Sequence, residues 1–230
     1  MQILDLVGAF LHVQVWLTNV TVQHVVTFVA LARRLQNRIA WQELASHRQT
    51  DVPPNGLPNT IISFLANAVG VEHHQVIALW EALRGVIWDS SKIPTAVTAP
   101  IVDDYAPFAL YGEKREILAE EFYPPTRYCL NDQCPTYLVT GSRQSMYDVS
   151  RTSAVLYTLA RGAYPVGVTS LYCRCCRSTY TLNYCRQTDT TGDSWRIYYE
   201  GLPRVLQVEK HMLFEDKLCN LFRSLTVHSQ

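Results

Sequence analysis

The hydrophobic pattern of the first half of the chain has the period of amphipathic helices. Across residues 1–48, apolar side chains recur at steps of three to five residues, which places them along one face of a helix. Thr18, Asn19 and Thr21 interrupt this pattern and are residue types that cap helices, so two helices are expected here. A turn with Pro-Pro and Asn-Gly steps follows within residues 50–58.

A second pair of helices is predicted on either side of Gly70. Apolar residues share one face before this glycine, from Ile61 to Val69, and one face after it, from Val76 to Ile87. A short helix, a glycine turn and a longer helix are typical of DNA-reading helix-turn-helix motifs and of any packed helical hairpin. Because the second helix carries only Arg84 as a cation, we interpret the pair as packed helices.

The period changes in the second half of the chain. Residues 89–110 are rich in proline, serine, threonine and aspartate, as in a linker, and a short helix is expected at 114–122. Beyond Pro125, short runs of valine, tyrosine, threonine and leucine predict strands, and an amphipathic pattern near the end predicts a helix. The expected strands are 154–159, 166–172, 178–184 and 195–199, and the expected helix is 213–225.

Composition excludes several classes of protein. Of the 230 residues, 48% are hydrophobic and 17% are charged, which is enough apolar material for a packed core. No apolar run reaches the length of a membrane span, and the N-terminus carries Asp5 without the early cations of a signal peptide. We therefore expect an intracellular protein whose cysteines are reduced.

The net charge is zero, but cations gather in one segment. Residues 127–186 contain seven arginines, two aspartates and no lysine, a local balance of +5. Such an asymmetry points to a polyanionic partner, and a mildly basic, solvated face is the alternative. The arginines are Arg127, Arg143, Arg151, Arg161, Arg174, Arg177 and Arg186.

All seven cysteines lie in the second half, and four of them have the spacing of metal ligands. Cys129 and Cys134 are separated by four residues, and Cys173 and Cys176, 38 residues further on, are separated by two. Two close pairs on tight turns, with a β-rich insert, are the layout of a zinc ribbon, because each turn supplies one edge of the tetrahedron that Zn²⁺ requires. The sequence therefore predicts a structural Zn²⁺ on these four thiolates.

Other roles for the cysteines remain open. Cys175 could replace a neighbour as ligand, and a second metal could use Cys185, His211 and Cys219. The cluster could also consist of core or redox thiols. A catalytic interpretation is weak, because a nucleophilic cysteine needs a nearby base and four cysteines would leave the metal no open position. We expect that the protein is not an enzyme and binds no small-molecule substrate.

The fold class follows from both patterns. We predict an α+β protein with an N-terminal helical bundle, residues 1–122, which includes the Pro-rich linker at 89–110. A β-rich, zinc-ribbon-like domain with a C-terminal helix is expected to occupy residues 123–230.

The second half also resembles a known family. The segments PPTRYCLNDQC, YTLARGAYPVGVTSLYCRCCRSTYTLNY and RIYYEGLPRVLQVEKHMLFEDKL are similar to the fifth class of CxC-type cysteine clusters associated with Kyakuja–Dileera–Zisupton (KDZ) transposases, found mainly in fungal mobile elements. The resemblance implies that the four predicted ligands are the family's zinc-binding cysteines. It also implies a nuclear module that binds DNA or chromatin beside a transposase. The chain has no recognisable catalytic Asp/Glu triad, so strand transfer is not assigned to it.

The sequence therefore leaves two candidate functions. The first is a zinc-binding accessory module that contacts DNA phosphates through Arg127, Arg174, Arg177 and Arg186, beside a transposase or chromatin protein. The second is a zinc-stabilised protein–protein interaction module with no direct nucleic-acid contact. Salt separates them, because polyanion binding weakens steeply with added salt and an apolar interface does not.

Overall fold

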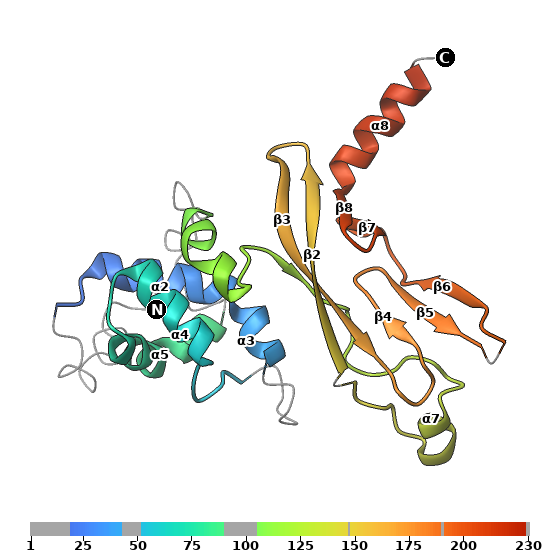
Figure 1. Cartoon of the computed structure of the whole chain (residues 1–230), viewed down its shortest axis with the longest axis horizontal. Coiled ribbons are helices and arrows are strands. Elements are labelled where there is room, and N and C mark those ends of the chain that lie inside the picture. Colours follow the sequence, from blue (N-terminus) through green and yellow to red (C-terminus); the bar gives the residue numbers. More distant parts are fainter. Residues whose placement is uncertain (1–18, 43–51, 90–104, 147, 190, 229–230) are drawn as a thin grey trace. The chain divides into compact units, whose positions relative to one another are not determined.

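The computed structural model describes residues 19–42, 52–89, 105–146, 148–189 and 191–228. The helix expected at the start of the chain and most of the Pro-rich linker lie outside these residues. The chain divides into two units, Met1–Ala119 and Glu120–Gln230 (Figure 1). Helices and a large mixed sheet are both present, so the α+β class is confirmed.

The first unit consists of helices around one apolar core. The α-helices of its described residues are α2 (Val22–Arg34), α3 (Gln36–Gln42), α4 (Asn59–Val69) and α5 (His73–Trp88). As expected, Thr21 caps α2: its hydroxyl accepts from the His24 amide at 3.2 Å, and His24 Nδ1 accepts from the Thr21 amide at 3.3 Å. Fully buried side chains from α2, α4 and α5 form the core, among them Phe28, Ile61 and Leu79.

The hairpin of α4 and α5 is confirmed, with Gly70 between the helices in the left-handed region at φ 80°. The preceding turn is tied to α5, because Trp80 Nε1 donates to the Pro54 carbonyl at 3.1 Å. Arg84, the cation of α5, donates to the same carbonyl at 3.2 Å and to Asn55 Oδ1 at 2.6 Å. This arginine is therefore engaged in packing, in agreement with the interpretation of the pair as packed helices.

A matched pair of glycine substitutions tests this hairpin. Gly70→Ala should destabilise the protein by about 1–2 kcal/mol, because a Cβ is disfavoured at a left-handed φ. Gly85→Ala, within α5, should stabilise it by about 0.5–1 kcal/mol, because alanine loses less backbone entropy in a helix. A Cβ at either position meets nothing within 4 Å, so packing does not confuse the comparison. Urea denaturation measures both, and equal effects would contradict the argument.

The prediction of a helix at 114–122 is wrong. A π-helical segment, η4 (Phe108–Gly112), and a short 3-10 turn, η5 (Glu113–Arg115), end at Glu116, which has a φ of 54°. The chain then extends, and β1 (Glu121–Phe122) pairs in parallel with β3 (Gly162–Tyr172). Pairing with a distant strand thus overrides the local helical preference.

The second unit is built on one eight-stranded mixed sheet that curls into a half-barrel (Figure 1). The strand order is β6-β5-β4-β3-β2-β8-β7, with β1 beside β3. The longest strand pair is the antiparallel hairpin of β2 and β3. Val166 and Val168 of β3 pack with Leu213 in the buried core of the sheet. Besides β1 and β3, the strands are β2 (Asp148–Thr158), β4 (Thr179–Tyr180), β5 (Tyr184–Thr188), β6 (Ser194–Tyr198), β7 (Val205–Glu209) and β8 (Met212–Glu215).

The end of the chain differs from the expectation. The strand predicted at 178–184 is interrupted between β4 and β5, and the antiparallel pair β7 and β8 was not predicted. Leu213 belongs to β8, so the final helix, α8 (Asp216–His228), begins three residues later than expected. Within the described segments, no helix is both long and apolar enough to cross a lipid bilayer.

Candidate metal centre

The four cysteines with metal-ligand spacing come together in the second unit. The Sγ atoms of Cys129, Cys134, Cys173 and Cys176 all lie within 4.8 Å of one another. Cys129 and Cys176 are 3.5 Å apart, and Cys134 and Cys173 are 3.9 Å apart. Three of the four are fully buried and Cys176 is half-buried. This group of thiols is close enough to hold one metal ion.

The first pair lies on a turn that leads into α7 (Pro135–Thr140). The Cys129 amide donates to the Gln144 carbonyl at 2.8 Å, which holds this cysteine to the returning chain. Asn131 makes the turn: its side chain accepts from the Gln133 amide at 2.9 Å and its carbonyl accepts from the Cys134 amide at 3.0 Å. Cys134 is the N-cap of α7, so the start of the helix positions its thiol.

The second pair lies on the turn between β3 and β4. Cys173 directly follows β3, and its amide donates to the Ser178 carbonyl at 2.9 Å. Arg177 closes the turn in the left-handed region at φ 57°. The Ser178 hydroxyl is fully buried and lies 3.1 Å from Cys176 Sγ. The sheet thus presents both thiols to the first pair.

Tyr180 connects the two turns, and the sequence did not predict this role at the metal site. Its fully buried hydroxyl accepts from the Leu130 amide at 2.7 Å and from the Asn131 amide at 3.1 Å. Because both lone pairs are used, its own proton is left to donate to Cys129 Sγ at 3.2 Å. Burial, followed by the bond to Cys129, raises the pKa of Tyr180, so this donor stays protonated. Tyr180 therefore orients Cys129 and its turn.

The surroundings divide the thiols by acidity. Burial raises the pKa of Cys129 to about 11 and raises that of Cys173 well above its usual range. Burial acts in the same direction on Cys176, but hydrogen bonds with the side chain and backbone of Ser178, and with the Cys129 and Cys173 thiols, together outweigh it and lower the pKa to about 7. Cys176 therefore becomes a thiolate, the form that binds metal, more readily than Cys129 or Cys173.

The arginines proposed for phosphate contact differ in exposure and lie on different elements. Arg174 and Arg177 are exposed on the turn of the second cysteine pair, and Arg186 is exposed on β5. Arg127 is half-buried, and burial lowers its pKa. Thr179, two residues after Arg177, pairs with Arg186 of β5.

Arg143 acts within the first turn. Its guanidinium forms a 2.7 Å ion pair with Asp132, lies 4.3 Å from the centre of the Tyr137 ring and donates to the Cys129 carbonyl at 3.4 Å. This arginine braces the loop that carries Cys129. Its sequence context could not separate it from the other arginines, because its partners are eleven and six residues away on a folded loop.

The remaining cysteines stand apart from the cluster. Cys185 is buried, Cys219 is half-buried, and Cys175 is exposed with its Sγ 3.1 Å from the Thr136 hydroxyl. His211 Nδ1 lies 3.0 Å from the Ser153 carbonyl. Among the described residues, no second group of three or more metal-ligating side chains was found, so the alternative site at Cys185, His211 and Cys219 has no support.

Comparison with known families agrees with this geometry. Residues 117–230 match the family model described as a CxC5 like cysteine cluster associated with KDZ transposases. The match covers the whole sheet and all four clustered cysteines. Comparisons with curated proteins and with solved structures find no match to the chain. Residues 117–230 therefore belong to the CxC5-like cysteine clusters associated with KDZ transposases.

Proposed function

We propose that the cysteine cluster holds one structural Zn²⁺ and that the second unit is a zinc-ribbon-like accessory module. This module binds DNA in the nucleus beside a KDZ-type transposase and has no catalytic activity of its own. The observation that carries the proposal is the convergence of four thiols from two separate turns within 4.8 Å. The family match supports the association with a transposase.

The donor set supports zinc. Thiolates about 2.3 Å from a tetrahedral Zn²⁺ are about 3.8 Å from one another. The Sγ separations of Cys129–Cys176 and Cys134–Cys173, 3.5 and 3.9 Å, lie close to that value. Soft thiolate donors alone favour zinc or iron–sulfur chemistry over magnesium or calcium. Four protein ligands complete the coordination shell, so no position remains for a substrate, and a structural role follows.

The exposed arginines support DNA binding. Arg174 and Arg177 lie on the metal-holding turn, where the coordinated cysteines would fix the backbone that carries them. Arginine is suited to phosphate because its planar guanidinium can donate two parallel hydrogen bonds. The local balance of +5 adds long-range attraction for a polyanion.

A double substitution tests the DNA contact. Arg174→Ala/Arg177→Ala should weaken binding of a short fluorescein-labelled duplex at low salt and lower the salt slope by about two, because each lost phosphate contact removes about 0.9 from the slope. Fluorescence anisotropy measures both. Arg223→Ala, on the exposed part of α8, is the matched control and should change neither. Duplex binding that is unchanged in the double variant would contradict the proposed contact.

The protein-interaction function is kept as the second candidate because of α7. Leu138 and Val139 are 64% and 86% exposed on this short helix, which follows Cys134 directly. Exposed apolar residues next to a rigid metal centre would suit a protein partner. Binding of a protein partner that persists at high salt and is lost in Leu138→Ser would favour this candidate.

A further inference from the structure

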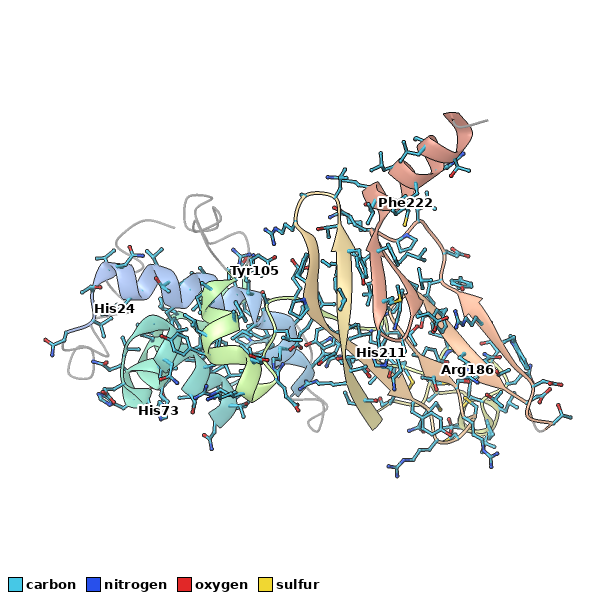
Figure 2. The ribbon with its side chains drawn as sticks, turned by 45° about the horizontal axis from the view of Figure 1, so that its top comes forward. His24, His73, Tyr105, Arg186, His211 and Phe222 are labelled. Atoms are coloured by element: carbon cyan, nitrogen blue, oxygen red, sulfur yellow. The ribbon has the colours of Figure 1, made fainter. Side chains whose placement is uncertain are left out.

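The sheet carries a second cationic surface that the metal-holding turns do not include. Strands β5 and β6 pair so that Arg186 lies directly opposite Arg196. Directly opposed residues of antiparallel strands point to the same face, so both arginines lie on one face of the sheet. The Arg186 guanidinium donates to Ser194 Oγ at 3.1 Å, and the Arg196 guanidinium lies over the Tyr184 ring. Like charges at directly opposed positions repel each other, and a bound polyanion would offset this repulsion. Both arginines are exposed (Figure 2 labels Arg186 on β5).

The same row continues across the sheet toward the metal-holding turn. Thr179 of β4 pairs with Arg186, and Tyr172 of β3 pairs with Thr179. The row therefore reads Tyr172, Thr179, Arg186, Arg196 from β3 to the edge strand β6. Tyr172 is 38% exposed and immediately precedes Cys173, so the row includes a residue next in sequence to the cysteine cluster.

Tyrosine rings border the arginines on this face. Tyr198 pairs with Tyr184, two residues along each strand from the arginine pair, and therefore shares their face. The Arg196 guanidinium lies 4.6 Å from the centre of the Tyr184 ring, and the Tyr198 ring lies 5.6 Å from that ring. Tyr184 is buried, whereas Tyr198 is 57% exposed and presents its ring to solvent.

The groups around Arg196 keep it charged. A side-chain hydrogen bond with Tyr198 and the proximity of Tyr184 raise the pKa of Arg196, with a smaller contribution from Glu209. Asp189 and Asp193 lie at the far tip of the hairpin, where Asp189 accepts from the amides of Thr191 and Asp193, both at 2.9 Å. The acidic tip thus bounds the cationic row on one side, and the path for a polyanion runs across the strands.

From these observations we infer that the face of Tyr172, Arg186, Arg196 and Tyr198 binds single-stranded nucleic acid, with arginines on the phosphates and the exposed tyrosines stacked on unpaired bases. Open aromatic rings beside cations are the pattern of single-strand platforms, whereas the base faces of a duplex are covered by their neighbours. This inference rests on the proposed function and names the form of nucleic acid that the module binds.

The test compares two probes on the full-length, zinc-loaded protein. Fluorescence anisotropy with labelled oligo(dT) and with a labelled duplex should show tighter binding of oligo(dT). Tyr198→Ala should weaken oligo(dT) binding about 10-fold, because one stacked base is lost. Tyr198→Phe keeps the ring and should retain binding. Arg196→Gln should lower the salt slope for oligo(dT) by about 0.7, the value for one single-strand phosphate contact.

The matched control is Trp195→Ala, which removes an aromatic residue of the same strand, 46% exposed, from the opposite face. It should leave oligo(dT) binding unchanged. Preference for the duplex, or equal effects of Trp195→Ala and Tyr198→Ala, would overturn the inference and leave the proposed DNA binding intact. Failure to bind either probe would overturn both, and stronger competition by polyglutamate than by oligo(dT) would assign the face to an acidic protein.

Discussion

Replacement of Cys176 by serine should abolish metal retention and unfold the second unit, whereas Cys175→Ser should leave both unchanged. Structural zinc contributes an apparent binding free energy of about 10–16 kcal/mol, which equals or exceeds the total stability of about 5–15 kcal/mol of a typical domain. Cys176 is one of the four clustered thiols, and Cys175, next to it in sequence, is exposed and outside the cluster.

Elemental mass spectrometry of the purified proteins measures the first effect, with one zinc expected per wild-type and Cys175→Ser chain and none for Cys176→Ser. Circular dichroism before and after a strong chelator measures the second. The helices of the first unit have their own core, so the helical spectrum should largely persist while the β contribution is lost. A metal-free wild type with a cooperative unfolding transition of the sheet would exclude the zinc proposal.

The second large effect is expected at Tyr180. Removing its hydroxyl in Tyr180→Phe leaves the Leu130 and Asn131 amides without their acceptor and Cys129 without its donor. Loss of a buried hydrogen-bond partner costs about 1–3 kcal/mol, and loss of a group that orients a metal ligand lowers metal affinity by about 10- to 100-fold. We expect both losses together, with the ring still filling the core.

Competition with a chromophoric zinc chelator measures the affinity, and urea denaturation of the zinc-loaded protein measures the stability. Tyr128→Phe is the control, because Tyr128 neighbours Cys129 in sequence but is 54% exposed. If Tyr180→Phe reduced stability and left zinc affinity at the wild-type value, Tyr180 would act only in packing and would not position the ligand.

Features that depend on local spacing were predictable. The apolar period around Gly70 predicted α4 and α5 within a few residues, because one face of each helix must be apolar to pack. The spacing of the cysteines predicted which four thiols meet, because a short turn is enough to bring the two members of each pair together. The choice of Cys176 over Cys175 agrees with the structure for the same reason.

Features that depend on distant partners were not predictable. The segment at 114–122 has helical composition, yet Glu121 and Phe122 form β1 because β3 offers a parallel partner. Strand β8 was assigned to the final helix because its pairing partners, β2 and β7, cannot be inferred from its own residues. In the same way, seven arginines looked alike in sequence, and only the folded loop engages Arg143 with Asp132 and Tyr137.

The sequence by itself therefore determined the α+β class, the helical hairpin and the identity of the clustered thiols, because each follows from periodicity or spacing over a few residues. Only the tertiary structure decided the strand order of the sheet, the role of Tyr180 and the row of Arg186 and Arg196. These depend on pairing between strands far apart in the chain, where packing and backbone hydrogen bonding outweigh local preference.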